Sequence, residues 1–260
     1  VGPGIYKLTV TDGNNCVDST SVTITEPTDL TAAITNSQNV ACNGSATGFA
    51  VVEGAGGTMP YTYLWQNGNT TDSIYNQTSG FYRVTVTDAN GCIDSTLANL
   101  TQPSSLTASV SSSTNNLCFG DSIGTGSVSV VGGASPYTYA WSTGSTSNTE
   151  TNLLAGNHIV TITDANNCQD TAMVSISEPA DIITSAYNQI NPLCFGNTNG
   201  EVTAAVSGGV GSFTYLWSNT DSDTILNNVG AGVYTFTATD GNGCQDSITV
   251  TIVEPADLVS

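Results

Sequence analysis

The residues best suited to do chemistry in this 260-residue chain are its seven cysteines, which recur at two fixed positions. One set opens C-x-G motifs, and the other ends eight-residue motifs of the type TVTDANGC. The two sets are Cys42, Cys118 and Cys194, and Cys16, Cys92, Cys168 and Cys244. Cysteines at regular positions of a repeated sequence indicate disulfide bonds and an oxidising, extracellular setting.

Other groups able to do chemistry are few. The single histidine, His158, stands where other copies of the motif carry a tyrosine, so we expect it to be structural. The chain has no repeated Ser-His-Asp set and no glycine-rich loop before a helix, and we therefore expect no enzyme. Clustered carboxylates make calcium a possible cofactor, although turn capping is the more ordinary role of such aspartates. The calcium candidates are Glu26, Asp29, Asp88 and Asp94.

The elements that position these residues follow a period of 76 residues, which also spaces the tryptophans and the linker prolines. This period is too long for a solenoid unit and suits small β-domains in tandem, which we expect to form an extended rod. Val1–Pro3 has no signal-peptide character, so we expect an internal fragment of a longer exported protein. The predicted domains are the C-terminal part of a first repeat at 1–27, full repeats at 28–103, 104–179 and 180–255, and the start of another at 256–260.

Side-chain alternation predicts an all-β fold. In YTYLW, Tyr61, Tyr63 and Trp65 share one face of a strand. About seven short strands, a tryptophan on the third and Gly-x-Tyr opening the penultimate strand predict immunoglobulin-like sandwiches with a tyrosine corner. In the third repeat we expect strand B at Gly124–Val131, C at Tyr137–Ser142, F at Asn157–Thr163 and G at Gln169–Ser177. The expected core residues are Trp65, Trp141, Trp217, Tyr6, Tyr82 and Tyr234.

Two disulfide schemes fit this fold. Bonds within a repeat would be Cys42–Cys92, Cys118–Cys168 and Cys194–Cys244, and bonds between successive repeats would be Cys42–Cys168 and Cys118–Cys244. In a sandwich of this kind the C-x-G turn and the hairpin between strands F and G lie at opposite ends of the domain, whereas a disulfide needs Cα atoms within about 7 Å. We favour the bonds between repeats and keep the others as the alternative.

The charge of the chain limits its partners. It has 21 acidic residues, only two lysines or arginines and a net charge of -19, so it would repel nucleic acids and anionic membranes. No apolar run approaches the roughly 20 residues that a membrane-spanning helix needs. The neighbouring repeats of the same chain are the partners expected first.

The order C-x-G, G-G-x-x-P-Y-x-Y-x-W, G-x-Y-x-V-T-V-T-D-A-N-G-C and E-P-x-x-L resembles the SprB-type repeat of gliding-motility adhesins over essentially the whole chain. The resemblance implies a large cell-surface filament, exported through the type IX pathway, that supports gliding and adhesion. Other parts of such a protein would contact a surface polysaccharide or the substratum. The alternative function is a carbohydrate-binding sandwich module of a secreted protein.

The resemblance also implies glycosylation, because bacteria of the gliding group attach O-linked glycans at Asp-Ser/Thr-hydrophobic sites on exported proteins. Such sites follow each TVTDANGC-type motif and recur elsewhere, near turns where these residues are also abundant for structural reasons. The candidates are Ser19, Ser95, Thr171, Ser247, Ser73, Ser122 and Thr224.

Overall fold

The structure, a computed structural model, describes residues 1–259 and contains in that range twenty β-strands and no helix. The residues at 1–27 form one antiparallel hairpin of β1 (Gly4–Thr11) and β2 (Val17–Ile24). Each of the three full repeats has six strands in two three-stranded sheets, with the same order in every repeat.

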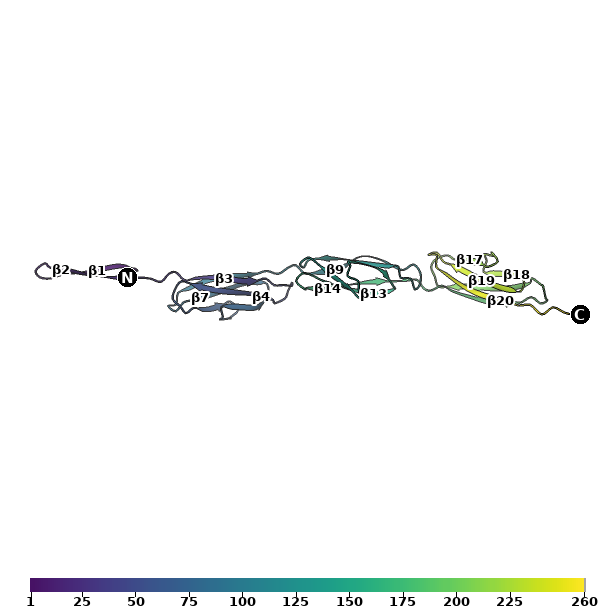
Figure 1. Ribbon diagram of the computed structural model, residues 1–260, viewed down its shortest axis with the longest axis horizontal. Coiled ribbons are helices and arrows are strands. Elements are labelled where there is room, and N and C mark those ends of the chain that lie inside the picture. The colour runs from purple at the N-terminus through teal and green to yellow at the C-terminus, as the bar shows by residue number, and fades with distance from the viewer. Residues whose placement is uncertain (260) are drawn as a thin grey trace. The chain divides into compact units, whose positions relative to one another are not determined.

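In the second repeat, one sheet has the order β3-β4-β6 and the other the order β5-β7-β8 (Figure 1). In immunoglobulin-like lettering these sheets are A-B-E and C-F-G. The bounds are β3 Thr31–Gln38, β4 Gly48–Ala55, β5 Thr62–Trp65, β6 Ser73–Gln77, β7 Gly80–Thr87 and β8 Ile93–Leu100.

The third and fourth repeats keep this plan. The strands of the third are β9 Thr107–Thr114, β10 Gly124–Val131, β11 Thr138–Trp141, β12 Thr149–Leu153, β13 Gly156–Thr163 and β14 Gln169–Ile176. Those of the fourth are β15 Ile183–Ile190, β16 Gly200–Ser207, β17 Thr214–Trp217, β18 Ile225–Val229, β19 Gly232–Thr239 and β20 Gln245–Ile252. The expected B strand therefore has the observed bounds, and the expected C, F and G strands differ by one residue at their ends.

The strand count is six in each full repeat where about seven were expected. The reason is the tight turn that follows strand C. The backbone N–H of Trp65 donates to the carbonyl of Asn69, and that of Gly68 donates back to the carbonyl of Trp65. This turn leads the chain into strand E without an intervening strand.

The chain divides into two compact units. One contains Val1–Leu106 together with two loops of the third repeat, Gly132–Ser135 and Ala165–Cys168. The other contains the remaining strands of the third repeat and all strands of the fourth.

The core of each full repeat lies between its two sheets and is built around one tryptophan. Trp65, Trp141 and Trp217 are 1%, 4% and 1% exposed, and each indole N–H donates to a carbonyl six residues later. Valines and isoleucines at alternate positions of strands F and G complete the core because alternation in a strand directs them to one face.

The tyrosine corner is present at each Gly-x-Tyr. The hydroxyls of Tyr6, Tyr82 and Tyr234 each donate to the carbonyl four residues earlier. Tyr82 and Tyr234 are partly buried against their cores, as expected. The expectation for Tyr6 was wrong, since it is 40% exposed. Its hairpin has no facing sheet within residues 1–259, and every residue of β1 and β2 is exposed.

One core position of the third repeat carries a charge. Glu150 on β12 stands where the second and fourth repeats have the fully buried Ile74 and Leu226. Its Oε2 atom is buried and has no hydrogen-bond partner. A carboxylate in such a position is costly, so this repeat carries a local defect in its core.

Candidate functional site

The candidate site is the junction between successive repeats, which consists of three parts. The C-x-G loop joins strands A and B of one repeat, the linker follows strand G of that repeat, and the F–G tip is the turn between strands F and G of the next. In the fourth repeat the F–G tip runs from Asp240 to Cys244, and the linker before it runs from Glu178 to Ile182.

The aspartate of the TVTDANGC-type motif shapes the F–G tip. One carboxylate oxygen of Asp240 accepts hydrogen bonds from the backbone N–H groups of Asn242 and Cys244, both at 2.9 Å. Asp88 and Asp12 make the same two bonds in their own tips. The motif recurs because this side chain fixes the turn that presents the cysteine.

These bonds set the charge state of the tip. Burial raises the pKa of Asp240, but the hydrogen bonds from Val210 and from the backbone N–H groups of the tip outweigh it and hold the pKa below its ordinary value. The same balance, with Thr58 in place of Val210, lowers the pKa of Asp88. Both carboxylates therefore stay ionised in the folded protein over the neutral pH range.

The C-x-G loop needs glycine for its shape. Gly44, Gly120 and Gly196 each have a φ of +74°, in the left-handed region that residues with a Cβ rarely adopt. The linker holds this glycine: the N–H of Gly120 donates to Oε2 of Glu178 at 2.7 Å, and the N–H of Gly196 donates to Glu254 at the same distance. The second repeat has glutamine in place of the glutamate.

Two disulfides connect successive repeats. Cys42 is bonded to Cys168 and Cys118 to Cys244, with Cα atoms 5.7 and 5.6 Å apart. We call these bonds staples. An amide beside each bond adds to it: Asn166 donates to the carbonyl of Ala41, and Asn242 donates to that of Leu117, both at 2.9 Å.

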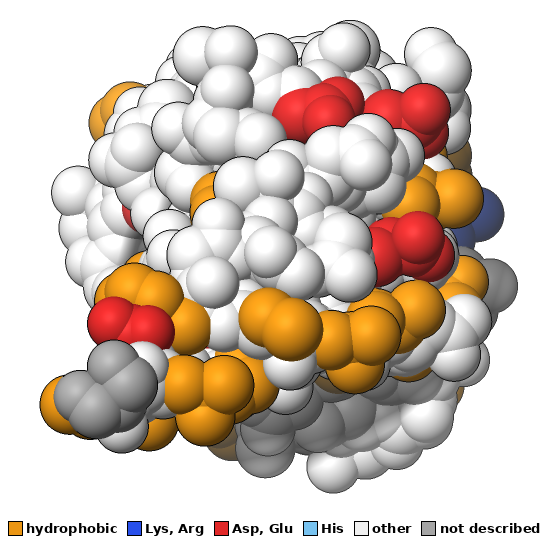
Figure 2. Space-filling model, turned by 90° about the vertical axis from the view of Figure 1, so that its right-hand side faces the viewer, with side chains coloured by type: hydrophobic (Ala, Val, Ile, Leu, Met, Phe, Trp, Pro, Cys, Tyr) orange, Lys and Arg blue, Asp and Glu red, His pale blue; other side chains and the backbone are white. Residues whose placement is uncertain are grey.

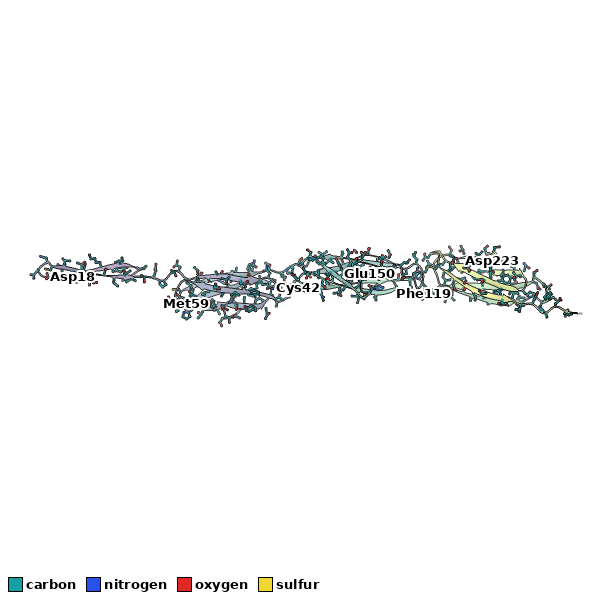
Figure 3. The ribbon with its side chains drawn as sticks, in the orientation of Figure 1. Asp18, Cys42, Met59, Phe119, Glu150 and Asp223 are labelled. Carbon is teal, nitrogen blue, oxygen red and sulfur yellow. A yellow bond between two sulfur atoms is a disulfide. The ribbon has the colours of Figure 1, made fainter. Side chains whose placement is uncertain are left out.

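The alternative pairing within repeats is not formed, because Cys92 and Cys194 carry free, exposed thiols, as does Cys16. The physical reason is the one argued from topology. Figure 3 shows Cys42 and Met59 at opposite ends of the second repeat. The F–G tip lies at the end of Met59, since the N–H of Ala89 donates to the carbonyl of Thr58. A strand length thus separates Cys42 from Cys92.

The calcium candidates are not brought together as a metal site. Glu26, Asp29 and Asp88 line one cavity of about 480 Å³. Within residues 1–259, however, no group of three or more His, Cys, Asp or Glu side chains has an arrangement that would hold a metal ion. Asp88 uses both oxygens for backbone N–H groups, and Asp94 accepts from the N–H of Ala32 at 2.7 Å.

The last contact shows a role that sequence reasoning missed. Asp94, Asp170 and Asp246 each accept a hydrogen bond from a backbone N–H of strand A, 62 residues earlier in the chain. This bond joins strand G to strand A across the two sheets, and it lowers the pKa of Asp246. The recurrence of the aspartate two residues after the cysteine was the available signal.

The glycosylation candidates lie in different environments. Ser19, Thr171, Ser247 and Ser122 are exposed, whereas Ser95, Ser73 and Thr224 are half-buried. The Asp-Ser/Thr pair at the start of strand G has the structural explanation just given for its aspartate. Its hydroxyl points away from the core, so the pair also remains open to modification at Thr171 and Ser247.

His158 takes over the tyrosine corner of the third repeat. Its Nε2 atom lies 2.9 Å from the carbonyl oxygen of Leu154, four residues earlier, as in the three tyrosine corners. This contact supports the structural role expected for the histidine.

The fold and the junctions define a series of tandem immunoglobulin-like sandwich domains. The SprB repeat family profile matches residues 34–70, 110–146 and 186–222, so the chain carries three SprB repeats at the spacing read from the sequence. SprB repeats come from cell-surface proteins, and the chain is the repeat region of a surface-adhesin type of protein. A search of curated protein sequences gave no significant match.

Several solved structures share the general fold at low identity. Three N-terminal domains of the bacteriophage RB49 highly immunogenic outer capsid protein are 14% identical, cover 86% of this chain and 97% of their own, and give a TM-score of 0.40. For titin domains I67–I69 the values are 12%, 83%, 94% and 0.34. For Sidekick-1 immunoglobulin domains 1–5 they are 11%, 97%, 66% and 0.33. Among the described residues no helix has the length and apolarity to cross a bilayer.

Proposed function

We propose that this chain is a stalk segment of a large exported cell-surface filament that supports gliding motility and surface adhesion, and that it has no catalytic role. The supporting observation is the pair of interleaved staples. Cys42–Cys168 and Cys118–Cys244 each span 126 residues, and the two spans overlap between Cys118 and Cys168. A tandem array joined in this way can carry tension without losing its length when a repeat unfolds.

The mechanical argument follows from the covalent path. Tension that enters at Cys42 crosses to Cys168 and continues along strand G of the third repeat, β14. The residues between the two cysteines are bypassed, so their unfolding adds no length to that path. Strands are already close to full extension, at about 3.3 Å per residue, and the path therefore lengthens little under load.

Export to the cell surface is consistent with the staples, since disulfides persist in oxidising surroundings. We further propose that secretion uses the type IX pathway, that the exposed Asp-Ser/Thr sites carry O-linked glycans, and that other parts of the protein bind the surface polysaccharide or substratum. The repeats themselves are proposed to form an extended rod. Small-angle scattering checks the last point, and a compact particle would contradict it.

The test of this function uses cells of the organism that encodes the chain. Antibodies against these repeats are expected to label the surface of intact cells, and beads coated with them are expected to be carried along gliding cells. Disabling type IX secretion should remove the label from the surface. Surface label that persists in such cells, or cells that glide normally after deletion of the protein, would contradict the proposal.

Carbohydrate binding by the repeats themselves is the alternative. The tryptophans do not serve it, because they are buried in all three cores. An exposed ring pairs with another aromatic ring at Tyr75 and Phe49, 5.6 Å apart, but the fourth repeat has Asn227 and Glu201 at these positions. No specific observation favours this alternative over the stalk.

A further inference from the structure

A complete junction shows what each of its three parts contributes. Between the third and fourth repeats, the C-x-G loop supplies Cys118 and Phe119, the linker supplies Pro179–Ile182, and the F–G tip supplies Asp240 and Cys244. Together they enclose a small cavity of about 100 Å³. The disulfide and the bond from Asn242 to the carbonyl of Leu117 hold the three parts together.

The same loop and linker recur without a tip. Leu193–Phe195 and Pro255–Leu258 line a larger cavity of about 280 Å³, and no residue of an F–G tip takes part in it. The loop has the same four residues as in the complete junction, Leu-Cys-Phe-Gly, and the same bond from its glycine to the linker glutamate. Its geometry is thus already that of the stapled loop.

This half junction exposes apolar surface. Leu193 is 77% exposed and Phe195 is 55% exposed, and the thiol of Cys194 is open to solvent. Figure 2, seen from the side of the C-terminal end, shows hydrophobic side chains gathered on this face with acidic side chains beside them. The complete junction shows what covers such a surface, namely an F–G tip with a cysteine.

Two F–G tips of this chain have free thiols, at Cys16 and Cys92. The tip at Cys92 already has a linker, because Pro27–Leu30 line a cavity with Asp88 and Cys92. Docking it on the loop at Cys194 would bring a second linker into the place of the first. The tip at Cys16 belongs to the fully exposed hairpin β1–β2 and brings no second linker.

The tip at Cys16 has the shape of a docked tip. Asp12 accepts from the N–H groups of Asn14 and Cys16, both at 2.8 Å, as Asp240 does in the complete junction. Asn14 stands at the position of Asn242, whose amide reaches the carbonyl of the C-x-G loop. The half junction and this tip are therefore complementary parts.

We propose that the loop at Cys194 and the linker Pro255–Leu258 form a docking site for the F–G tip of a second copy of this chain, held by a disulfide between Cys194 and Cys16. The amide of Asn14 donates to the carbonyl of Leu193 in this junction. Because the two surfaces are different, the contact is head to tail and adds further copies in series. The inference stands independently of gliding or adhesion.

The bond forms by thiol–disulfide exchange with oxidised glutathione. The Cys16 thiolate attacks glutathione disulfide and becomes capped, releasing one reduced glutathione. The thiolate of Cys194 then attacks the capped sulfur of Cys16, forming the protein disulfide and releasing the second glutathione. Two thiols are oxidised and one glutathione disulfide is reduced.

This staple would continue the covalent path of the chain. From Cys168 the path runs along β14, the linker and β15 to Cys194, and then crosses to the tip of the next copy. Only two strands and a linker lie between one staple and the next. The mechanical bypass is thereby passed on from junction to junction.

The experiment incubates the full chain in a glutathione redox buffer at physiological salt, followed by non-reducing peptide mapping of the linked species. Cys16–Cys194 is expected to exceed every other pairing of the three free thiols. Cys16→Ser and Cys194→Ser should each abolish the head-to-tail product, while Cys92→Ser, the matched control, should leave it unchanged.

A further variant tests docking apart from the thiols. Asn14→Ala keeps all cysteines and should lower the yield of Cys16–Cys194 about fivefold, the effect of losing one ordinary hydrogen bond. Pairing in statistical proportions, a predominance of Cys92–Cys194, or the absence of linked species would overturn the proposal. So would a yield unaffected by Asn14→Ala, since the tip would then not dock as it does at Cys244.

Discussion

Removing the two staples is predicted to more than double the length to which the chain can be pulled. With the staples in place, the shortest covalent path from Val1 runs to Cys42, crosses to Cys168, returns to Cys118 and crosses to Cys244 before reaching the C-terminal end. That path contains roughly 105 residues, or about 370 Å at about 3.5 Å per residue, whereas the chain without staples reaches about 900 Å. The difference of about 530 Å is the predicted gain.

Single-molecule force spectroscopy on the chain held at its two ends measures this gain. The staple-free protein replaces all four stapled cysteines by serine, at positions 42, 118, 168 and 244. The matched control replaces the three free cysteines by serine, at positions 16, 92 and 194, and keeps both staples. We expect full extension near 900 Å for the first protein and near 370 Å for the second.

The control also separates the two pairing schemes. If cysteines paired within repeats, the control would retain only Cys118–Cys168, and the chain would extend to about 730 Å. An extension of that size, or one equal to that of the staple-free protein, would refute the reasoning. An increase in length on adding a reductant to the control, up to the staple-free value, would support it.

Three further predictions concern single residues. Asp240→Asn should lower the stability of the fourth repeat at neutral pH and weaken its loss in acid: the folded-state pKa lies below the unfolded value of about 3.9, so the ionised carboxylate stabilises the fold above that value and the effect disappears as pH falls through the folded pKa; urea titrations from pH 7 to 2 check both, and an unchanged acid slope would contradict the assignment. His158→Tyr should stabilise the third repeat by about 0.5–1 kcal/mol in thermal unfolding, because the hydroxyl makes the corner bond of Tyr234 and adds a larger ring; a loss of stability would show that the histidine is the better fit. Glu150→Ile should raise the stability of the same repeat by about 1–3 kcal/mol, since it removes a buried oxygen without a partner; hydrogen exchange of the third-repeat peptides measures this, and a neutral result would mean that solvent already reaches the carboxylate.

The repeat, the strands and the pairing of the staples could be predicted because each depends on local pattern or on topology alone. The B strand at Gly124–Val131 follows from alternation between two glycine-rich turns. The separation of Cys42 from Cys92 follows from strand order, which places the A–B and F–G turns at opposite ends of a sandwich. Neither inference needs knowledge of how particular side chains pack.

The missed features depend on contacts between residues far apart in the sequence. The bond from Asp94 to the N–H of Ala32 links positions 62 residues apart, and no local pattern at Asp94 distinguishes it from an exposed turn residue. The exposure of Tyr6 could not be read from its motif, which is the same as at Tyr82, because burial requires a facing sheet. The half junction at Cys194 became visible only by comparison with the complete one at Cys118.

The measurement that tests the central claim most directly is non-reducing peptide mapping of the purified chain by mass spectrometry. The account predicts peptides that join Cys42 to Cys168 and Cys118 to Cys244, with Cys92 alkylated as a free thiol before digestion. Peptides that join Cys42 to Cys92 and Cys118 to Cys168 would contradict it, because the staples between repeats and the tension path built on them would then not exist.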